Sequence, residues 1–192
     1  MLVQPGKRDK KTQDLLKSVM RFLLLGIQPR GPEATGACWV AGTGDFQLLK
    51  ADIRASAFLK SSHYASWEKA IPEDDSLAII AHTRFPTVGS TKTSANNHPI
   101  KCGPVVGVHN GHVSNHTQVR TKMSLKKDGD VDSEVIFRVL EKHIDSSTKE
   151  LNISEFTKDF KELYGQAAVA AINMHKPGKL FLVRSGNPIS IA

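Results

Sequence analysis

Short apolar runs joined by tight-turn residues constrain the fold of this chain more than any other feature. Residues 37–40 and 46–49 are mostly apolar and flank Gly-Thr-Gly-Asp, which predicts a β-hairpin. Further strands are predicted at residues 77–81, 105–109, 166–172 and 180–183. Because strands joined by tight turns pair antiparallel, this order excludes a simple doubly wound parallel sheet.

Amphipathic helices are predicted between these strands. Apolar residues recur with the 3.6-residue period of a helix in residues 12–25, 132–144 and 154–164. The polar residues expected to cap their N-termini are Thr12, Asp132 and Ser154. The mixture of strands and helices predicts one layered domain spanning residues 1–192. Residues 189–192, Ile-Ser-Ile-Ala, are typical of the middle of a strand, so we expect the domain to be cut short at its C-terminus.

Composition narrows the classes of function. A chain of 192 residues with 40% hydrophobic content suits one globular domain. The net charge is +7, but the basic residues are mostly scattered and no aromatic residues interleave with them, which argues against a specific nucleic-acid site. The apolar segment 19–27 contains Arg21 and is too short to span a bilayer, so we expect no membrane partner. Two cysteines make no disulfide framework and suit a reducing, cytoplasmic location.

The dipeptide Asn110-Gly111 has two interpretations. Asn-Gly between apolar runs is a strong hairpin signal, because both residues tolerate positive φ. Alternatively, a side-chain amide and a neighbouring backbone N–H form an oxyanion hole, and a glycine lets the substrate approach the backbone closely. The two interpretations are compatible, since a tight turn presents both donors.

Two charged residues suggest recognition of a free amino acid. Arg84 follows a predicted strand, where an arginine is more often a surface or capping residue, but its planar guanidinium also suits a bidentate grip on a carboxylate. Thr87 is a candidate hydroxyl donor to the same carboxylate. Asp132 is explained by helix capping alone, and its functional use is to pair with a substrate ammonium group.

Histidines and cysteines offer weaker candidates. His109, His112 and His116 have spacings that suit a metal, but a strand followed by a turn argues against their convergence, so no metal site is expected. Cys38 lies in an apolar strand and is expected in the core, whereas Cys102 lies in a loop and is expected to be exposed. Neither has an evident basic partner, so neither is a candidate nucleophile.

Six motifs, in order, resemble the glutamine-binding domain of class II glutamine amidotransferases. Residues 28–36 resemble the family's arginine-glycine segment, and Val-His-Asn-Gly at 108–111 and Asp-Ser-Glu-Val-Ile at 132–136 resemble later motifs. The motif at residues 81–90 is mixed: residues 81–84 resemble the glucosamine-6-phosphate synthase branch, and residues 85–90 resemble the phosphoribosyl-pyrophosphate amidotransferase branch. The last two motifs, residues 97–99 and 184–188, again resemble the synthase branch. The family resemblance is therefore specific, while the branch stays open.

The resemblance implies an α+β fold, the four-layer αββα sandwich of the N-terminal nucleophile hydrolases. It also implies hydrolysis of the glutamine side-chain amide to glutamate and ammonia, with transfer of ammonia to an acceptor synthase domain or subunit. By resemblance, Arg84 and Thr87 bind the glutamine carboxylate and Asp132 binds its ammonium group. Asn110 and Gly111 form the oxyanion hole. No cofactor is implied.

The chain departs from the family at its start. The family opens Cys-Gly-Ile-x-Gly, and its N-terminal cysteine is the nucleophile, whereas Met1-Leu2-Val3 resembles only the continuation of that strand. About five upstream residues and the C-terminal strands are therefore expected to be missing. Since removing a covalent nucleophile lowers the rate about 10⁶-fold, the chain as written is predicted to be inactive. The alternative is a degenerate, non-catalytic domain that binds glutamine or a partner protein.

Overall fold

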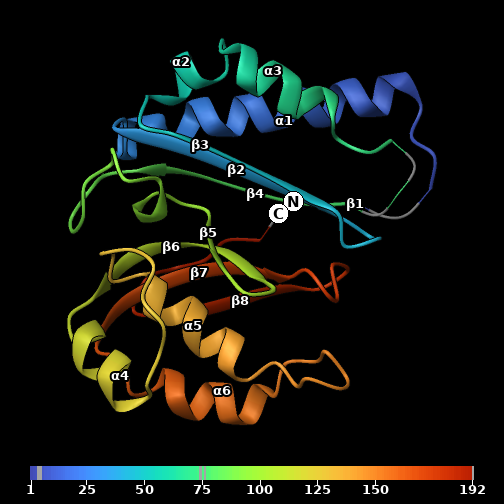
Figure 1. Cartoon of the computed structure of the whole chain (residues 1–192). Coiled ribbons are helices and arrows are strands. Elements are labelled where there is room, and N and C mark those ends of the chain that lie inside the picture. Colours follow the sequence, from blue (N-terminus) through green and yellow to red (C-terminus); the bar gives the residue numbers. More distant parts are fainter. Residues whose placement is uncertain (4–5, 74, 76, 192) are drawn as a thin grey trace.

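The structure, a computed structural model, describes residues 1–3, 6–73, 75 and 77–191. In these residues two four-stranded antiparallel sheets lie face to face between two layers of helices (Figure 1). Helices α1 to α3 cover the first sheet, and helices α4 to α6 cover the second. This αββα arrangement confirms the predicted fold class, and the antiparallel pairing confirms the exclusion of a parallel sheet.

The first sheet has the strand order β1-β4-β2-β3. Its strands are β1 (Leu2–Val3), β2 (Ala34–Ala41), β3 (Phe46–Ala51) and β4 (Leu77–Arg84). Strands β2 and β3 are the predicted hairpin, and β1 pairs with the beginning of β4. The outer layer contains α1 (Lys10–Ile27), the 3-10 turn η1 (Gln28–Arg30), α2 (Ala55–Phe58) and α3 (Ser62–Lys69).

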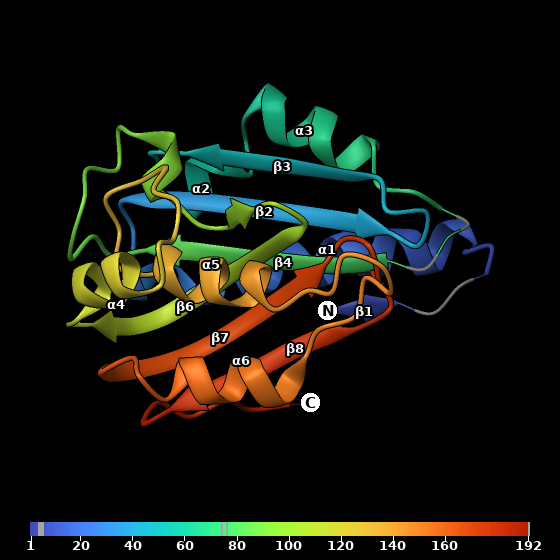
Figure 2. The ribbon, with the colours of Figure 1, turned by 60° about the horizontal axis from the view of Figure 1, so that its bottom comes forward.

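The second sheet has the strand order β5-β6-β7-β8. Its strands are β5 (Ile100–Cys102), β6 (Val105–Val113), β7 (Gly165–Asn173) and β8 (Leu180–Ser185). The 3-10 turn η2 (Ser94–Asn96) precedes β5. The helices α4 (His116–Lys122), α5 (Glu134–Lys142) and α6 (Ile153–Phe160) cover the outer face, where α5 and α6 lie side by side (Figure 2).

Apolar side chains fill the interfaces between the layers. The contact between the two sheets is made by β2, β4, β6 and β7 through Cys38, Val40, Ala78, Ile80, Val106 and Ile172. Separate clusters lie beneath each helical layer, around Trp67 on α3 and around Phe137 on α5. Burial of this apolar surface holds β4 and β6 face to face, so residues at the end of β4 lie opposite residues in the middle of β6.

Two helices begin at residues other than the predicted caps. The Asp9 carboxylate accepts a hydrogen bond from the Thr12 amide at 2.8 Å and caps α1, and the Asn152 side chain accepts one from the Glu155 amide at 3.2 Å and caps α6. Thr12 and Ser154 therefore lie inside the first turns. The capping predictions were wrong because an earlier polar residue already accepts from one of the free amides of each first turn.

Several elements differ from the sequence prediction. Helices α2, α3 and α4 and strand β5 are short segments that were not predicted. Residues 188–191 form no strand, because no described strand pairs with them, and Ala192 lies outside the described residues. No helix in the described part of the chain is both long and apolar enough to cross a membrane.

Candidate functional site

A cavity of about 380 Å³ lies where the end of β4 faces the middle of β6. Its lining comes from the end of α1, from β4 and the loop after it, from β6, and from the residues that lead into α5. The five residues predicted from the sequence as a site all line it: Arg84, Thr87, Asn110, Gly111 and Asp132. The fold therefore brings together residues from three separate motifs in one concave site.

Arg84 is the last residue of β4 and is buried, with only 4% of its surface exposed. Nη1 donates to Asn97 Oδ1 at 2.9 Å, and Nη2 donates to the carbonyls of Val88 at 2.5 Å and Gly89 at 3.0 Å. The interpretation as a surface or capping residue was wrong, since the guanidinium instead braces the loop that follows β4. These bonds leave Nε–H and one Nη1–H without a partner among the described residues.

Asp132 is also buried and does not cap α5. Its Oδ2 accepts a hydrogen bond from the Val113 amide at 2.7 Å and lies 3.3 Å from Nδ1 of His112. The carboxylate therefore binds the end of β6, so the capping interpretation was wrong. Burial lowers the pKa of Arg84, and the negative charge of Asp132 acts in the opposite direction, so the two groups share one electrostatic environment.

Asn110 and Gly111 lie inside β6 and form no hairpin turn. They pair with Ala168 and Ala167 of β7, so the hairpin interpretation was wrong. Gly111 has φ +148°, and a Cβ there would lie 1.9 Å from the Gln166 carbonyl oxygen, so the position requires glycine. Asn110 is exposed to the cavity, and its backbone carbonyl accepts a hydrogen bond from Asn187 at 2.9 Å.

Comparison with known proteins fits this geometry. No family model matches the chain. It is 26% identical over 184 residues to glutamine–fructose-6-phosphate aminotransferase of Buchnera aphidicola. The aligned region covers 91% of the chain and 28% of that protein. The Pseudomonas syringae enzyme of the same name is 36% identical over 118 residues, covering 58% of the chain and 18% of that protein. The chain is therefore similar in sequence to class II glutamine amidotransferases.

Solved structures support the same fold at lower sequence identity. The glutamine phosphoribosylpyrophosphate amidotransferase of B. subtilis superimposes with a TM-score of 0.59 at 15% identity, over 90% of this chain and 34% of that one. The αββα sandwich is therefore that of the N-terminal nucleophile hydrolases, as the motifs predicted. The chain spans less than a third of the length of these curated relatives, so the matched region is only part of each.

Histidines are the part of the cavity lining that the sequence analysis did not single out. The rings of His82 and His98 lie 4.4 Å apart, and burial lowers the pKa of both, that of His82 to about 4. Nδ1 of His82 and both ring nitrogens of His98 have no hydrogen-bond partner among the described residues. Both rings are therefore neutral near pH 7. The sequence signal that could have identified these two histidines is that they lie within the motifs that contain Arg84 and Asn97.

His109 was considered from the sequence only as a metal ligand, and it has another role in the fold. Its Nδ1 lies 2.8 Å from Ser133 Oγ and its Nε2 lies 3.3 Å from the Gln166 carbonyl oxygen. The contact with Ser133 ties β6 to the start of α5 next to Asp132. Within the described residues, no three His, Cys, Asp or Glu side chains are grouped so as to hold a metal ion.

Neither cysteine belongs to the cavity. Cys38 is buried between the sheets, as predicted, and Cys102 is also buried, so its predicted exposure was wrong. Cys102 ends β5 and packs with the apolar cluster under α5, which the loop-like sequence did not indicate. Burial raises the pKa of each thiol to about 12, so neither forms a thiolate near neutral pH.

Proposed function

We propose that the cavity binds glutamine, and that residues 1–192 form the glutaminase domain of a cytoplasmic class II amidotransferase. With an N-terminal cysteine in place, the domain hydrolyses the glutamine side-chain amide to glutamate and ammonia. One observation carries the proposal: a buried arginine and a buried aspartate line the same cavity as Asn110 and Gly111. No metal or cofactor is needed for this reaction.

The two charges suit the two ends of a free amino acid. The free N–H groups of Arg84 are donors for the carboxylate, with the exposed Thr87 hydroxyl beside it. Oδ1 of Asp132 has no hydrogen-bond partner among the described residues and is an acceptor for the ammonium group. A glutamine held at these two points directs its side-chain amide along the cavity towards Asn110 and Gly111.

The register of β1 supports the position of a nucleophile. The Met1 amine donates to the Ile79 carbonyl at 2.8 Å, and Leu2 pairs with Ala78. Each step upstream in an antiparallel pair moves the partner one residue further along β4. In this register a residue five positions before Met1 would lie opposite Arg84, at the cavity. The family's opening Cys-Gly-Ile-x-Gly has this length, so its cysteine would meet the bound glutamine.

The chemistry follows from that placement. The cysteine sulfur attacks the amide carbon, and the negative charge that develops on the oxygen is stabilised by the Asn110 amide and a backbone N–H at Gly111. The α-amino group of the cysteine takes the thiol proton when the sulfur attacks, and gives it to the leaving nitrogen as the carbon–nitrogen bond breaks and ammonia departs. Water then cleaves the thioester to release glutamate and restore the thiol. The acceptor of the ammonia would lie on another domain or subunit, and the names of the relatives point to a sugar phosphate.

The test compares two proteins. The 192-residue chain and the same chain preceded by Cys-Gly-Ile-Val-Gly are assayed for glutamate release from glutamine. We expect turnover only from the extended protein, and substitution of its first cysteine by alanine should lower the rate by about 10⁶-fold. An extended protein that is folded, binds glutamine and releases no glutamate would refute the catalytic proposal.

A non-catalytic domain that binds glutamine is the second candidate. The retained Arg84 and Asp132, together with two cysteines that cannot act as nucleophiles, favour it for the 192-residue chain. Calorimetry with millimolar glutamine on that chain distinguishes the outcomes. Heat of binding without turnover, in the extended protein as well, supports this candidate, and the absence of heat eliminates it.

A further inference from the structure

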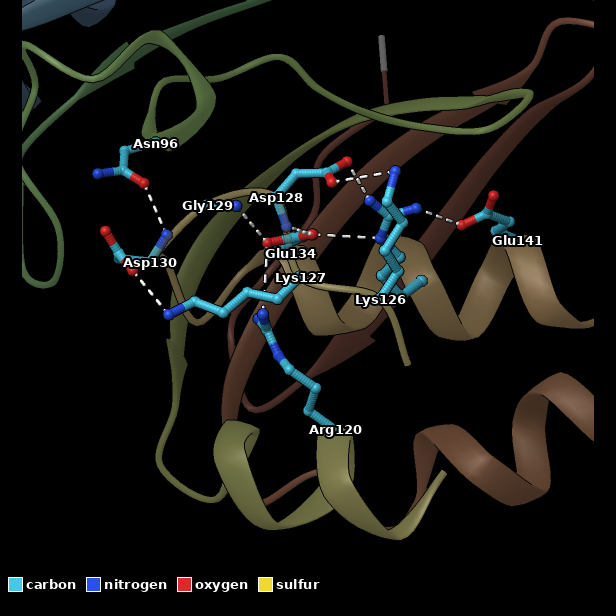
Figure 3. Close-up of polar contacts among 10 residues, drawn as sticks. Asn96, Arg120, Lys126, Lys127, Asp128, Gly129, Asp130, Glu134 and Glu141 are labelled. Carbon is cyan, nitrogen blue, oxygen red and sulfur yellow. Dashed lines mark hydrogen bonds and ion pairs between the residues drawn. The ribbon is translucent and has the colours of Figure 1, made fainter. Parts of the chain in front are cut away.

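One buried side chain joins the two loops that carry the charges of the cavity. Asn96, in η2, is only 1% exposed. Its Nδ2 donates to the Ser90 carbonyl at 3.1 Å, and its Oδ1 accepts from the Asp130 amide at 2.8 Å. Figure 3 shows the Asn96 side chain bound to the Asp130 amide. The other residues drawn belong to α4, to α5 and to the loop between them, whereas Asn96 comes from a separate part of the chain. A single amide therefore links the loop after β4 to the loop before α5.

The Ser90 side of this link leads directly to Arg84. Ser90 follows Gly89, whose carbonyl accepts from Arg84 Nη2 at 3.0 Å. Gly89 has φ +78°, and a Cβ there would lie 2.7 Å from Asn96 Nδ2. Only glycine therefore lets this loop approach the Asn96 amide so closely. The position of Asn96 and the position of the guanidinium are set by the same stretch of backbone.

The Asp130 side of the link leads to Asp132, two residues further along the chain. Glu134 fixes this loop from the helix, since its carboxylate accepts from the amides of Asp128 and Gly129 at 2.9 Å each (Figure 3). Glu134 is itself held by Arg138 at 3.2 Å. A Cβ on Gly129 would lie 3.0 Å from Asn96 Oδ1, so Asn96 and Glu134 clamp the loop between them.

We propose that Asn96 is a positioning residue that sets the separation between Arg84 and Asp132, and so makes the cavity selective for a free α-amino acid. The carboxylate and the ammonium group of such a ligand share one carbon, so their separation is fixed. Binding both at once requires the two protein charges to be held at a matching distance. This inference rests on the proposed glutamine site.

The experiment measures how strongly the two ends of the ligand cooperate. Binding is compared for glutamine, for glutaric acid monoamide, which lacks the ammonium group, and for 4-aminobutanamide, which lacks the carboxylate. NMR shift titrations of the 192-residue chain measure each affinity. Asn96→Ala should weaken glutamine binding roughly tenfold, because the two sites lose their spacing, and change the affinity of either single-ended ligand less than about twofold.

The chain offers a matched control. Asn173 is also 1% exposed, and its side chain likewise donates to a backbone carbonyl, that of Lys149 at 2.8 Å, and accepts from a backbone amide, that of His175 at 3.0 Å. None of these residues lines the cavity. Asn173→Ala should lower the melting temperature about as much as Asn96→Ala and leave all three affinities unchanged.

Each outcome decides between the hypotheses. The positioning role would be overturned if Asn96→Ala lowered the affinity for all three ligands equally. It would also be overturned if the three affinities of Asn96→Ala matched those of Asn173→Ala. Failure of the unmodified chain to bind glutamine would refute the proposed function instead. If Asn96→Ala does not fold, Asn96→Asp replaces it: this variant keeps an acceptor for the Asp130 amide, loses the donor to Ser90, and should show the same selective loss for glutamine.

Discussion

Arg84 and Arg138 are buried to nearly the same extent, 4% and 5% exposed, in opposite surroundings. Arg138 on α5 is surrounded by carboxylates, since it pairs with Glu134 at 3.2 Å, with Glu141 at 2.7 Å and with Asp128. Arg84 lies in the cavity, and its hydrogen bonds go to carbonyl and amide oxygens only. One guanidinium is neutralised by the protein, and the other has no ion pair among the described residues.

The pKa values of the two arginines move in opposite directions for this reason. Burial is the largest single influence and acts to lower the pKa of Arg138, but the hydrogen bonds to Glu141 and Glu134 and the negative charge around the guanidinium together outweigh it, and the pKa is raised. Burial lowers the pKa of Arg84, and the charge of Asp132 compensates only in part. A buried charge without a partner is unfavourable unless it serves a ligand. The contrast therefore separates an arginine that is neutralised within the fold from the one to which we assign the ligand carboxylate.

The largest expected effect comes from removing the neutralised arginine. Arg138→Met leaves Glu134 with only Arg120, at 3.6 Å, and Asp128 with only Lys126, at 3.2 Å, and removing one partner of a buried ion pair costs about 3–5 kcal/mol. We expect the free energy of unfolding in urea to fall by that amount, whereas Arg184→Met, at an exposed arginine of β8, should leave it unchanged. A loss below about 1 kcal/mol would mean that the ion pairs of Arg138 stabilise the fold no more than surface ion pairs do. The difference drawn between Arg138 and Arg84 would then be wrong.

The next effect concerns the neutral bases of the cavity. His82 has its pKa lowered to about 4 by burial, and that of His98 is also lowered, from an ordinary value of 6.5. The unfolded chain therefore binds protons that the folded chain does not, so stability is full above pH 6.5 and falls as the pH drops towards 4. The slope is up to about 1.4 kcal/mol per pH unit for each histidine.

Unfolding free energies measured at intervals from pH 7.5 to 4.5 test this slope. His82→Asn removes one titrating group and should make the curve shallower across that window. His63→Asn, at an exposed histidine of α3, should leave the slope as it is. A curve with the same slope in all three proteins would mean that His82 takes up its proton as readily in the folded chain as in the unfolded one, and below pH 6.5 the cavity would then hold more positive charge than Arg84 alone.

The sequence predicted the elements of the sandwich wherever the signal was local and periodic. The hairpin of β2 and β3 and the amphipathic helix α1 both follow from the spacing of their own apolar residues. The sequence also predicted which residues line the cavity. Arg84, Asn110 and Asp132 each belong to a motif, and the motifs follow one another along the chain in a characteristic order. That order carries information about the fold that no single residue contains.

The partners of these residues were not predictable, because they lie far away in the chain. Asn110-Gly111 favours a hairpin locally, but pairing with β7, more than fifty residues later, keeps it in a strand. Asp132 precedes a helix, yet its carboxylate binds the amide of Val113. The contrast between Arg84 and Arg138 is invisible in the sequence for the same reason, since only the fold decides which carboxylates surround each guanidinium.

The smallest effect is the most direct test of that contrast. Arg84→Lys keeps the positive charge but replaces a planar fork by a point charge, so the bidentate grip on a carboxylate is lost. We expect glutamine affinity, measured by calorimetry, to fall about tenfold, or about 1.4 kcal/mol, with Arg184→Lys as the unchanged control. If Arg84→Lys instead lowers stability and leaves the affinity of the folded protein as it was, Arg84 only braces its loop. Arg84 would then, like Arg138, serve only the stability of the fold, and the glutamine carboxylate would have to be bound by Thr87 or Arg30, which also line the cavity.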